Sequence, residues 1–159
     1  MKKRIKLVIT DVDGVLTDGG MYYSEKGDEL KKFNTRDGVG VRLLQEAGIE
    51  VCIMTGESTD IVKRRAEKLN IPMVFQNVKD KKAKLIEILK QKGLQPDEVA
   101  HIGDDLGDIE VMKLVGLSAT VCDGMDEVKK NASYICGKSG GEGAFREFAD
   151  FILKGREEE

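Results

Sequence analysis

The sequence predicts an α/β fold in which helices cover both faces of a doubly wound parallel β-sheet. Short apolar runs alternate along the chain with amphipathic segments. Most of these runs are apolar at every position, which is typical of strands covered on both faces. Several of the amphipathic segments end in Gly or Asn, as helices often do. The length of 159 residues, of which 40% are apolar, suits a single packed domain.

The expected elements follow the order of repeated strand–helix–strand units, as in Rossmann-like proteins. Strands are predicted at 6–10, 50–55, 73–75, 99–103 and 117–121. Helices are predicted at 38–48, 59–70, 80–93, 106–116 and 144–154. In the last helix, Phe145, Phe148, Phe151 and Ile152 are spaced so that they bury one face.

One interval departs from this alternation. MYYS (21–24) and ELKKFN (29–34) flank EKGD, and this pattern predicts a β-hairpin with a glycine-containing turn just after the first strand. We therefore expect one domain over 1–154, with the hairpin inserted in place of a separate cap domain. The acidic residues 155–159 are expected to form a frayed tail.

Composition argues against two classes of partner. The net charge is −3 and only 5% of residues are aromatic, so the chain has neither a basic stripe nor stacking platforms for nucleic acid. The N-terminal MKKRIKLVIT is basic and then apolar, but its apolar run is short and meets aspartate at once. We interpret it as a first strand and expect a cytoplasmic protein that does not enter a membrane.

Polar residues follow three of the predicted strands, where the ligands of open parallel sheets bind. Asp11 and Asp13 follow the first strand, and Thr55 and Gly56 follow the strand at 50–55. The strand at 99–103 leads into GDDLGD. Around the start of the helix at 80–93 lie three candidate lysines, Lys79, Lys81 and Lys82, any of which could present an ammonium to the same edge. Close carboxylates favour a divalent cation or a shared proton. A lone DxD is more often a turn, and only the combination points to a phosphate site.

The order DVDGV, TG, Lys, GDDLGD resembles the four motifs of the haloacid dehalogenase superfamily of phosphatases. Within it, the chain is similar to the small, minimally capped phosphatases that act on 3-deoxy-D-manno-octulosonate 8-phosphate (KDO 8-phosphate). NTRDGVGVR (34–42) and GKSGGEGAFRE (137–147) carry this narrower resemblance. It implies a phosphomonoesterase of lipopolysaccharide precursor synthesis that works as a homotetramer.

The resemblance also implies catalytic roles. Asp11 would attack phosphorus and form an aspartyl-phosphate, and Asp13 would act as the general acid and base. Thr55 and Lys81 would bind the transferring phosphoryl oxygens. Mg²⁺ would be held by the Asp11 carboxylate, the backbone carbonyl of Asp13 and Asp104.

Recognition of a sugar acid would use guanidinium groups, which match a carboxylate in a bidentate way. The residues at the family's substrate positions are Asn34, Arg36, Asp37, Gly38, Arg42, Gly56, Arg65 and Arg146. Glu57 stands where relatives often carry arginine, which leaves the sugar acid open. The alternatives are another substrate, such as an N-acylneuraminate 9-phosphate, or a tetramer-forming interaction module with weak phosphatase activity.

Two residues of the acidic loop GDDLGD have roles that the sequence leaves open. Either Asp105 or Asp108 could hold a metal-bound water, orient Lys81 or cap a helix that begins at Leu106. His101 lies inside the strand at 99–103, so we expect it to be a structural, hydrogen-bonded side chain.

The glycine-rich tail has two interpretations. Gly140, Gly141 and Gly143 could form a turn before the last helix. The resemblance instead implies that the tail crosses into a neighbouring subunit's site and supplies Arg146 there. Hairpin residues Met21, Tyr22 and Tyr23 would then be interface anchors, although such side chains also serve ordinary packing.

Overall fold

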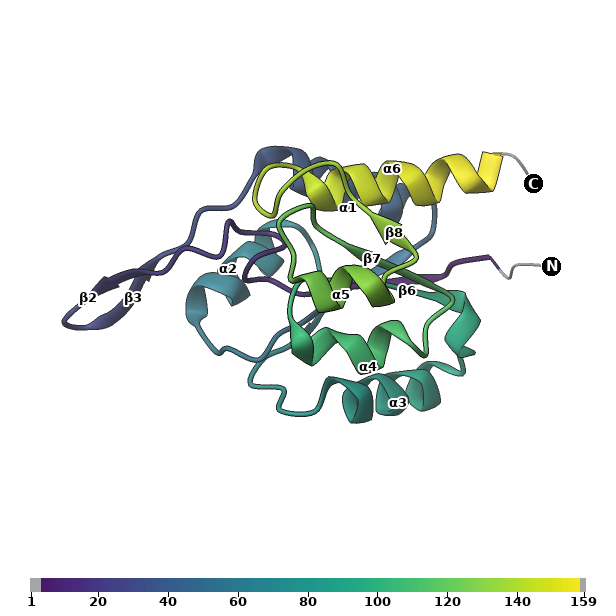
Figure 1. Cartoon of the computed structure of the whole chain (residues 1–159), viewed down its shortest axis with the longest axis horizontal. Helices are drawn as coiled ribbons and strands as arrows, with labels where there is room; N and C mark the ends of the chain where they lie inside the picture. Colours follow the sequence, from purple (N-terminus) through teal and green to yellow (C-terminus); the bar gives the residue numbers. More distant parts are fainter. Residues whose placement is uncertain (1–3, 158–159) are drawn as a thin grey trace.

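The computed structural model describes residues 4–157 and is built around a six-stranded sheet (Figure 1). The strand order is β5-β4-β1-β6-β7-β8, and every neighbouring pair is parallel. The strands are β1 (Leu7–Thr10), β4 (Glu50–Met54), β5 (Met73–Phe75), β6 (Val99–Gly103), β7 (Leu117–Thr120) and β8 (Tyr134–Ile135). The chain builds outward from β1 on one side and then returns to the other side. In open α/β sheets, ligands bind at such a reversal, so the carboxyl end of β1 is the expected position of a binding site.

Helices cover both faces of this sheet, which confirms the predicted fold class. They are α1 (Thr35–Glu46), α2 (Asp60–Lys68), α3 (Lys81–Lys92), α4 (Ile109–Met112), α5 (Asp126–Asn131) and α6 (Ala144–Glu157). Two 3₁₀ turns, η1 (Pro96–Glu98) and η2 (Leu106–Asp108), flank β6. Polar side chains cap helix starts: Asp80 accepts from the backbone N–H of Ala83 at the start of α3.

Alternate residues of β1 enter different cores, as the period of a strand requires. Val8 packs in a core that includes residues of α1, α2 and α6. Leu7 and Ile9 face the opposite side, where α3 and α4 complete a second core. Burial on both faces explains why β1 is apolar throughout.

The predicted hairpin is present and projects from the body of the molecule (Figure 1). It consists of β2 (Tyr22–Ser24) and β3 (Gly27–Leu30), which pair antiparallel. The second strand begins two residues earlier than predicted, because the turn lies at 25–26 and Gly27 has a φ of +108°.

Several predicted boundaries were wrong, each for a local reason. Helix α1 begins earlier than expected, since the Asn34 side chain accepts from the N–H of Arg36. The helix expected over 106–116 is divided into η2 and the short α4. The two-residue strand β8 and the helix α5 were not predicted.

Helix α6 continues past residue 154 to Glu157, so residues 155–157 are helical rather than frayed. The Arg156 guanidinium donates to the carbonyl oxygens of Ala47 and Ile5 at 2.6 and 2.7 Å, which anchors this end. Residues 158–159 of the predicted tail lie outside the described residues. Among the described helices, none has the length and apolar character needed to cross a membrane.

Candidate active site

The register of the sheet brings three sequence-predicted residues to one edge. Thr10, the last residue of β1, lies opposite Ile53 of β4 and Ile102 of β6. Asp11 comes one residue later and donates its backbone N–H to the Ile102 carbonyl at 3.1 Å. Thr55 directly follows β4, and Asp104 directly follows β6, just as Asp11 directly follows β1. Parallel pairing of the three strands therefore places Thr55 and Asp104 beside Asp11.

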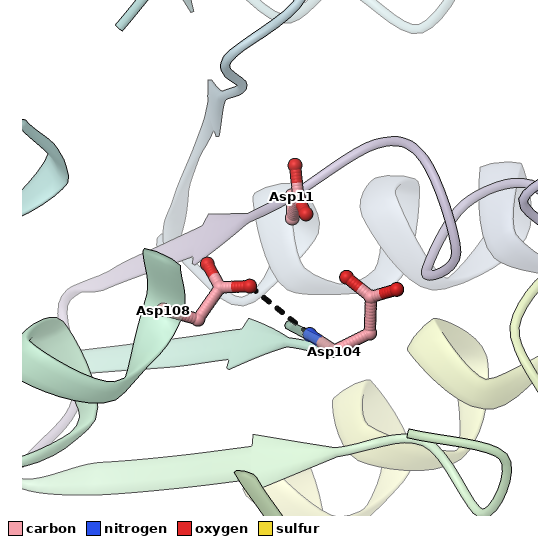
Figure 2. A group of neighbouring side chains, drawn as sticks. All are labelled: Asp11, Asp104 and Asp108. Carbon is pink, nitrogen blue, oxygen red and sulfur yellow. Dashed lines mark hydrogen bonds between the residues drawn. The ribbon is translucent and has the colours of Figure 1, made fainter. Parts of the chain in front are cut away.

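Three carboxylates form a compact acidic group at this edge (Figure 2). One oxygen from each of Asp11, Asp104 and Asp108 lies within 4.8 Å of the others. Burial and then the charge of Asp108 raise the pKa of Asp11. Burial and then Asp11 raise the pKa of Asp104 to about 8. Two carboxyl groups that resist ionisation together favour a bound dication, so the donor set fits a hard metal ion.

Asp104 offers a ligand atom to such an ion. Its Oδ1 is buried and has no hydrogen-bond partner among the described residues. Gly14 lies against this carboxylate, where a β-carbon would overlap Asp104 Oδ2. The φ of Gly14 is +84°, so the turn after Asp13 requires glycine in both conformation and space.

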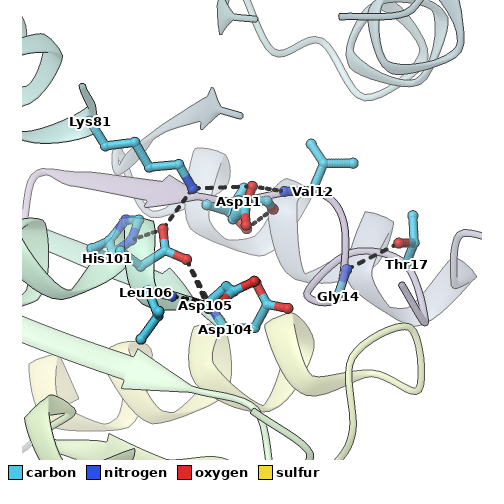
Figure 3. Close-up of polar contacts among 11 residues, drawn as sticks. Asp11, Val12, Gly14, Thr17, Lys81, His101, Asp104, Asp105 and Leu106 are labelled. Carbon is cyan, nitrogen blue, oxygen red and sulfur yellow. Dashed lines mark hydrogen bonds and ion pairs between the residues drawn. The ribbon is translucent and has the colours of Figure 1, made fainter. Parts of the chain in front are cut away.

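Lys81 joins the nucleophile candidate to a second carboxylate (Figure 3). Its Nζ lies 2.7 Å from Asp108 Oδ1 and 3.4 Å from Asp11 Oδ1. Burial lowers the pKa of Lys81, but the charges of Asp11 and Asp108 outweigh this effect and raise the pKa overall. The ammonium is therefore a fixed positive charge beside Asp11, as predicted among the three candidate lysines.

Asp108 is saturated by protein partners. Its Oδ1 also meets Nε2 of the fully buried His101 at 3.0 Å, and its Oδ2 accepts from the backbone N–H groups of Asp104 and Asp105. Burial raises the pKa of Asp108, but His101 and then Lys81 outweigh burial and hold the pKa well below its usual range. Asp108 is thus an orienting group for Lys81, and His101 is structural, as predicted.

Asp105 has the capping role that the sequence left open. Its Oδ1 accepts from the backbone N–H of Leu106 at 2.7 Å, at the start of η2. Unlike Asp108, it lies outside the acidic group.

The side chain of Asp13 also lies outside the acidic group and is held by a residue that the sequence did not indicate. Lys31, at the base of the hairpin, places its Nζ 2.7 Å from Asp13 Oδ1. The Lys31 side chain is only 1% exposed, which is unusual for lysine. A lone basic residue on an exposed hairpin gives no sequence signal for such a contact.

The catalytic loop after β1, residues 11–19, is closed by another residue that the sequence did not indicate. Thr17 is fully buried, and its hydroxyl oxygen accepts from the backbone N–H groups of Gly14 and Gly19, both at 3.2 Å. Backbone pairing of Thr17 with Phe33 ties this loop to the segment that leaves the hairpin.

The glycine-rich tail forms a turn at 140–143 directly before α6, as one of its two interpretations predicted, and it packs against the catalytic loop. The crossing into a neighbouring subunit's site stays a prediction. The backbone N–H of Gly141 donates to the Val15 carbonyl at 3.0 Å. A β-carbon on Gly140 would overlap the carbonyl oxygen of Gly14, and one on Gly141 would crowd the backbone of Thr17. Glycine is needed here for close backbone approach, a reason that the sequence analysis did not consider.

Some predicted substrate residues form one connected cluster beside this tail. Asn34 donates its side-chain amide to the Gly141 carbonyl, and Arg65 donates to the Asn34 carbonyl at 3.2 Å. Gly38 lies against Arg65, where a β-carbon would be 3.2 Å from the guanidinium. Asp37 is buried and accepts from the backbone N–H of Arg146 at 3.0 Å, so it fastens α1 to α6.

The remaining predicted substrate residues are more dispersed. Arg42 is exposed on α1 and lies 3.7 Å from Glu46, one helical turn away. The Arg146 Nε donates to both carboxylate oxygens of Asp150 at 3.0 and 3.1 Å. Arg36 is exposed near Gly143, and Gly56 directly follows Thr55 at the sheet edge. Their roles in binding substrate stay predictions.

Comparison with known proteins agrees with this geometry. Residues 72–147 match the model of a family described as haloacid dehalogenase-like hydrolases. A curated relative from Yersinia pestis, 3-deoxy-D-manno-octulosonate 8-phosphate phosphatase, is 44% identical over 94% of this chain and 80% of its own length.

Two solved structures are also similar. The 3-deoxy-D-manno-octulosonate 8-phosphate phosphatase from Moraxella catarrhalis, in complex with magnesium, phosphate and KDO, has a TM-score of 0.91 and 39% identity, covering 94% of this chain and 86% of that one. The cobalt-bound enzyme from Haemophilus influenzae has a TM-score of 0.94 and 38% identity, covering 97% and 90%.

Proposed function

The chain belongs to the 3-deoxy-D-manno-octulosonate 8-phosphate phosphatase family of haloacid dehalogenase-like hydrolases, and we propose that it hydrolyses KDO 8-phosphate to the free sugar acid and phosphate. As a phosphoric monoester hydrolase it has the catalytic groups that this reaction needs. The observation that carries the proposal is the position of Asp11, a buried carboxylate between the Lys81 ammonium and a second carboxyl group, at the carboxyl end of β1.

We infer a mechanism with a covalent intermediate. Asp11 attacks phosphorus and forms an aspartyl-phosphate, while Lys81 stabilises the charge on the phosphoryl oxygens. Thr55, buried beside Asp11 at the end of β4, binds another phosphoryl oxygen through its hydroxyl, since its backbone N–H already donates to the Phe75 carbonyl. Asp13 protonates the departing sugar oxygen and then takes a proton from the water that attacks the intermediate.

Mg²⁺ fits the donors at this edge. The Asp11 carboxylate, the Asp13 backbone carbonyl and Asp104 would hold it, and water would complete the octahedron. The ion supplies positive charge that lets an anionic nucleophile approach an anionic phosphate. Asp108 is not proposed as a ligand, because both of its oxygens already accept hydrogen bonds from protein groups.

The sugar acid is the less constrained part of the proposal. Glu57 follows Gly56 at the edge of the site, and a carboxylate there repels an anionic substrate group that arginine would attract. This residue leaves the sugar acid open, and the second candidate is a nine-carbon sugar acid such as an N-acylneuraminate 9-phosphate. An interaction module without catalysis is disfavoured, since Asp11, Asp13 and Lys81 are all present.

We further propose that the enzyme works in the cytoplasm, in the synthesis of lipopolysaccharide precursors, and assembles as a homotetramer. The exposed hairpin side chains Met21, Tyr22 and Tyr23 support an interface at the hairpin, because they are large and at least 44% exposed in the single chain.

The test is phosphate release from a panel of phosphate esters in the presence of Mg²⁺. The panel contains KDO 8-phosphate, an N-acylneuraminate 9-phosphate, simple sugar phosphates and p-nitrophenyl phosphate. We expect the highest kcat/KM for KDO 8-phosphate. A higher value for the nine-carbon ester selects the second candidate, and no phosphate release from any ester refutes a phosphatase.

A further inference from the structure

We propose that Lys31 is a positioning residue for catalysis, which holds one oxygen of Asp13 so that the other oxygen handles the proton of the leaving group. The inference rests on the proposed phosphatase activity and adds a hairpin residue to it. Its basis is the ion pair between Lys31 Nζ and Asp13 Oδ1, at 2.7 Å.

Burial makes this contact specific. The Lys31 side chain is 1% exposed, although it directly follows the last residue of β3 in the projecting hairpin. A buried ammonium requires a hydrogen-bond acceptor, and Asp13 Oδ1 provides one both in the carboxylate and in the protonated acid. The ammonium also donates to the sulfur of Met21 at 3.9 Å. Lys31 is therefore directed toward the catalytic loop and not toward solvent.

The two oxygens of Asp13 have different surroundings. Oδ1 is occupied by Lys31, whereas Oδ2 is buried and has no hydrogen-bond partner among the described residues. When Asp13 is protonated on Oδ2, that proton passes to the leaving oxygen as its bond to phosphorus breaks. The resulting carboxylate then takes a proton from the attacking water, which restores the acid. Lys31 fixes the rotation of the carboxyl group through both transfers.

The ion pair also joins two segments that the sheet does not hold together. Asp13 belongs to the catalytic loop after β1, whereas Lys31 belongs to the hairpin stem. Pairing of Thr17 with Phe33 lies beside this junction. The position of the hairpin is thereby linked to the orientation of the general acid.

A comparison of leaving groups tests this role. p-Nitrophenolate leaves without protonation, but a sugar alkoxide requires it. We expect Lys31→Met to lower kcat/KM for the best alkyl phosphate of the panel by about 10²-fold, and for p-nitrophenyl phosphate by less than about threefold. kcat/KM is the correct quantity, because it excludes hydrolysis of the aspartyl-phosphate, which both substrates share. Equal losses for both substrates would show a general structural role and overturn the proposal.

Three further variants sharpen the test. Lys32→Met is the matched control, since the neighbouring Lys32 pairs with Glu142 at 3.4 Å and is more than half exposed; we expect no change in either substrate. Asp13→Asn should reproduce the selectivity of Lys31→Met. The double variant should be no worse than Asp13→Asn alone, because Lys31 acts through Asp13. Additive losses would contradict this.

Other measurements distinguish a failure of the Lys31 proposal from misfolding of a variant and from a failure of the proposed function. Circular dichroism checks each variant, and Lys31→Gln, with the same expected selectivity, replaces a Lys31→Met that does not fold. If the wild-type protein releases no phosphate from any ester, the proposed function fails. Crystal structures of Lys31→Met and Lys32→Met then test whether the contact with Lys31 fixes the rotation of the Asp13 carboxylate. An Asp13 carboxylate that keeps its rotation without Lys31 overturns the positioning role.

Discussion

Asp108 holds Lys81 in place: Lys81 Nζ lies 2.7 Å from Asp108 Oδ1, and the Asp108 side chain is 1% exposed. The same oxygen also contacts Nε2 of His101 at 3.0 Å, and this second contact fixes the carboxylate. Lys81, which we propose to be catalytic, is thus oriented by a carboxylate that is itself fully hydrogen-bonded, and its ammonium lies beside Asp11.

Asp108→Asn should therefore damage both stability and catalysis. Asparagine keeps the shape but removes the charge that faces Lys81, and breaking a buried ion pair costs about 3–5 kcal/mol. We expect the free energy of unfolding to fall by about this amount, and kcat/KM by at least about tenfold. Denaturant unfolding and steady-state kinetics measure the two effects.

The control for this prediction is Asp105→Asn. Asp105 caps the N–H of Leu106, and asparagine is an equally good cap, so stability and activity should stay near wild type. If Asp108→Asn behaved like Asp105→Asn, the orienting role of Asp108 would be wrong.

How far the sequence predicted this site depended on the kind of contact. Asp11, Thr55 and Asp104 could be placed together because each directly follows an apolar strand, and parallel pairing aligns strand ends. The roles of Asp105 and Asp108 depended on which backbone N–H groups turn toward each carboxylate. That geometry is set by the η2 turn, which the helical pattern over 106–116 did not indicate.

Contacts between distant segments were outside the reach of the sequence. Lys31 and Asp13 are separated by the whole hairpin, and nothing in the local pattern joins them. Gly140 and Gly141 do lie in the turn before α6 that the sequence allowed, but the sequence did not indicate that this turn packs against the catalytic loop. The hydrophobic periodicity of the sequence predicts which face of a helix or strand is buried, but it does not predict which loops contact one another.

Asp11→Asn should abolish turnover and leave the fold intact. The amide keeps the shape of the side chain but cannot form the aspartyl-phosphate, so kcat should fall by at least about 10³-fold. Burial and the charge of Asp108 raise the pKa of Asp11, so the ionised Asp11 side chain is unfavourable in the metal-free fold. A neutral asparagine removes its repulsion with Asp108, and the melting temperature of the metal-free variant should be no lower than that of the wild type. Asp18→Asn, an exposed change in the same loop, should retain full activity. Near-normal turnover by Asp11→Asn would refute the mechanism.

Metal dependence should appear in stability as well as in activity. Chelation should stop phosphate release, and added Mg²⁺ should restore it. Mg²⁺ at a hundred times its dissociation constant should also stabilise the wild-type fold by about 2.7 kcal/mol, measured by thermal melting. Asp104→Asn removes a ligand and should lose most of this stabilisation, whereas Asp105→Asn should retain it. Full activity in excess chelator would contradict the site.

Asp37 should make stability depend on pH. Burial raises the pKa of Asp37 to about 6, against the opposing hydrogen bond from the backbone of Arg146 and the charge of Arg65. The folded state then binds a proton that the unfolded chain has already lost, so stability falls as the pH rises from about 4 to 6. Asp37→Asn keeps an acceptor for Arg146 without the titration. Relative to wild type, the variant should become more stable over this window, by an amount on the order of 3 kcal/mol.

The comparison is made by denaturant unfolding at fixed Mg²⁺ concentration, so that the acidic group stays in one state. Above pH 7 the difference in the free energy of unfolding between the variant and the wild type should be constant, since Asp37 is then ionised in both the folded and the unfolded wild type. A difference that does not change between pH 4 and 7 would show that Asp37 titrates normally.

Gly140→Ala tests the packing of the tail against the catalytic loop. A β-carbon at this position would overlap the carbonyl oxygen of Gly14 and lie 2.9 Å from that of Thr17, so the loop or the tail must move. Overpacking of this kind costs about 1–3 kcal/mol. Because Gly14 also lies against Asp104, we expect the movement to lower kcat/KM for both aryl and alkyl phosphates by about tenfold or more. Gly155→Ala is the matched control: Gly155 lies within α6 with open space around its Cα, so alanine there should stabilise the protein by about 0.5–1 kcal/mol and leave kinetics unchanged. If both variants kept wild-type kinetics, the tail would be a spacer before α6 and not a support for the catalytic loop.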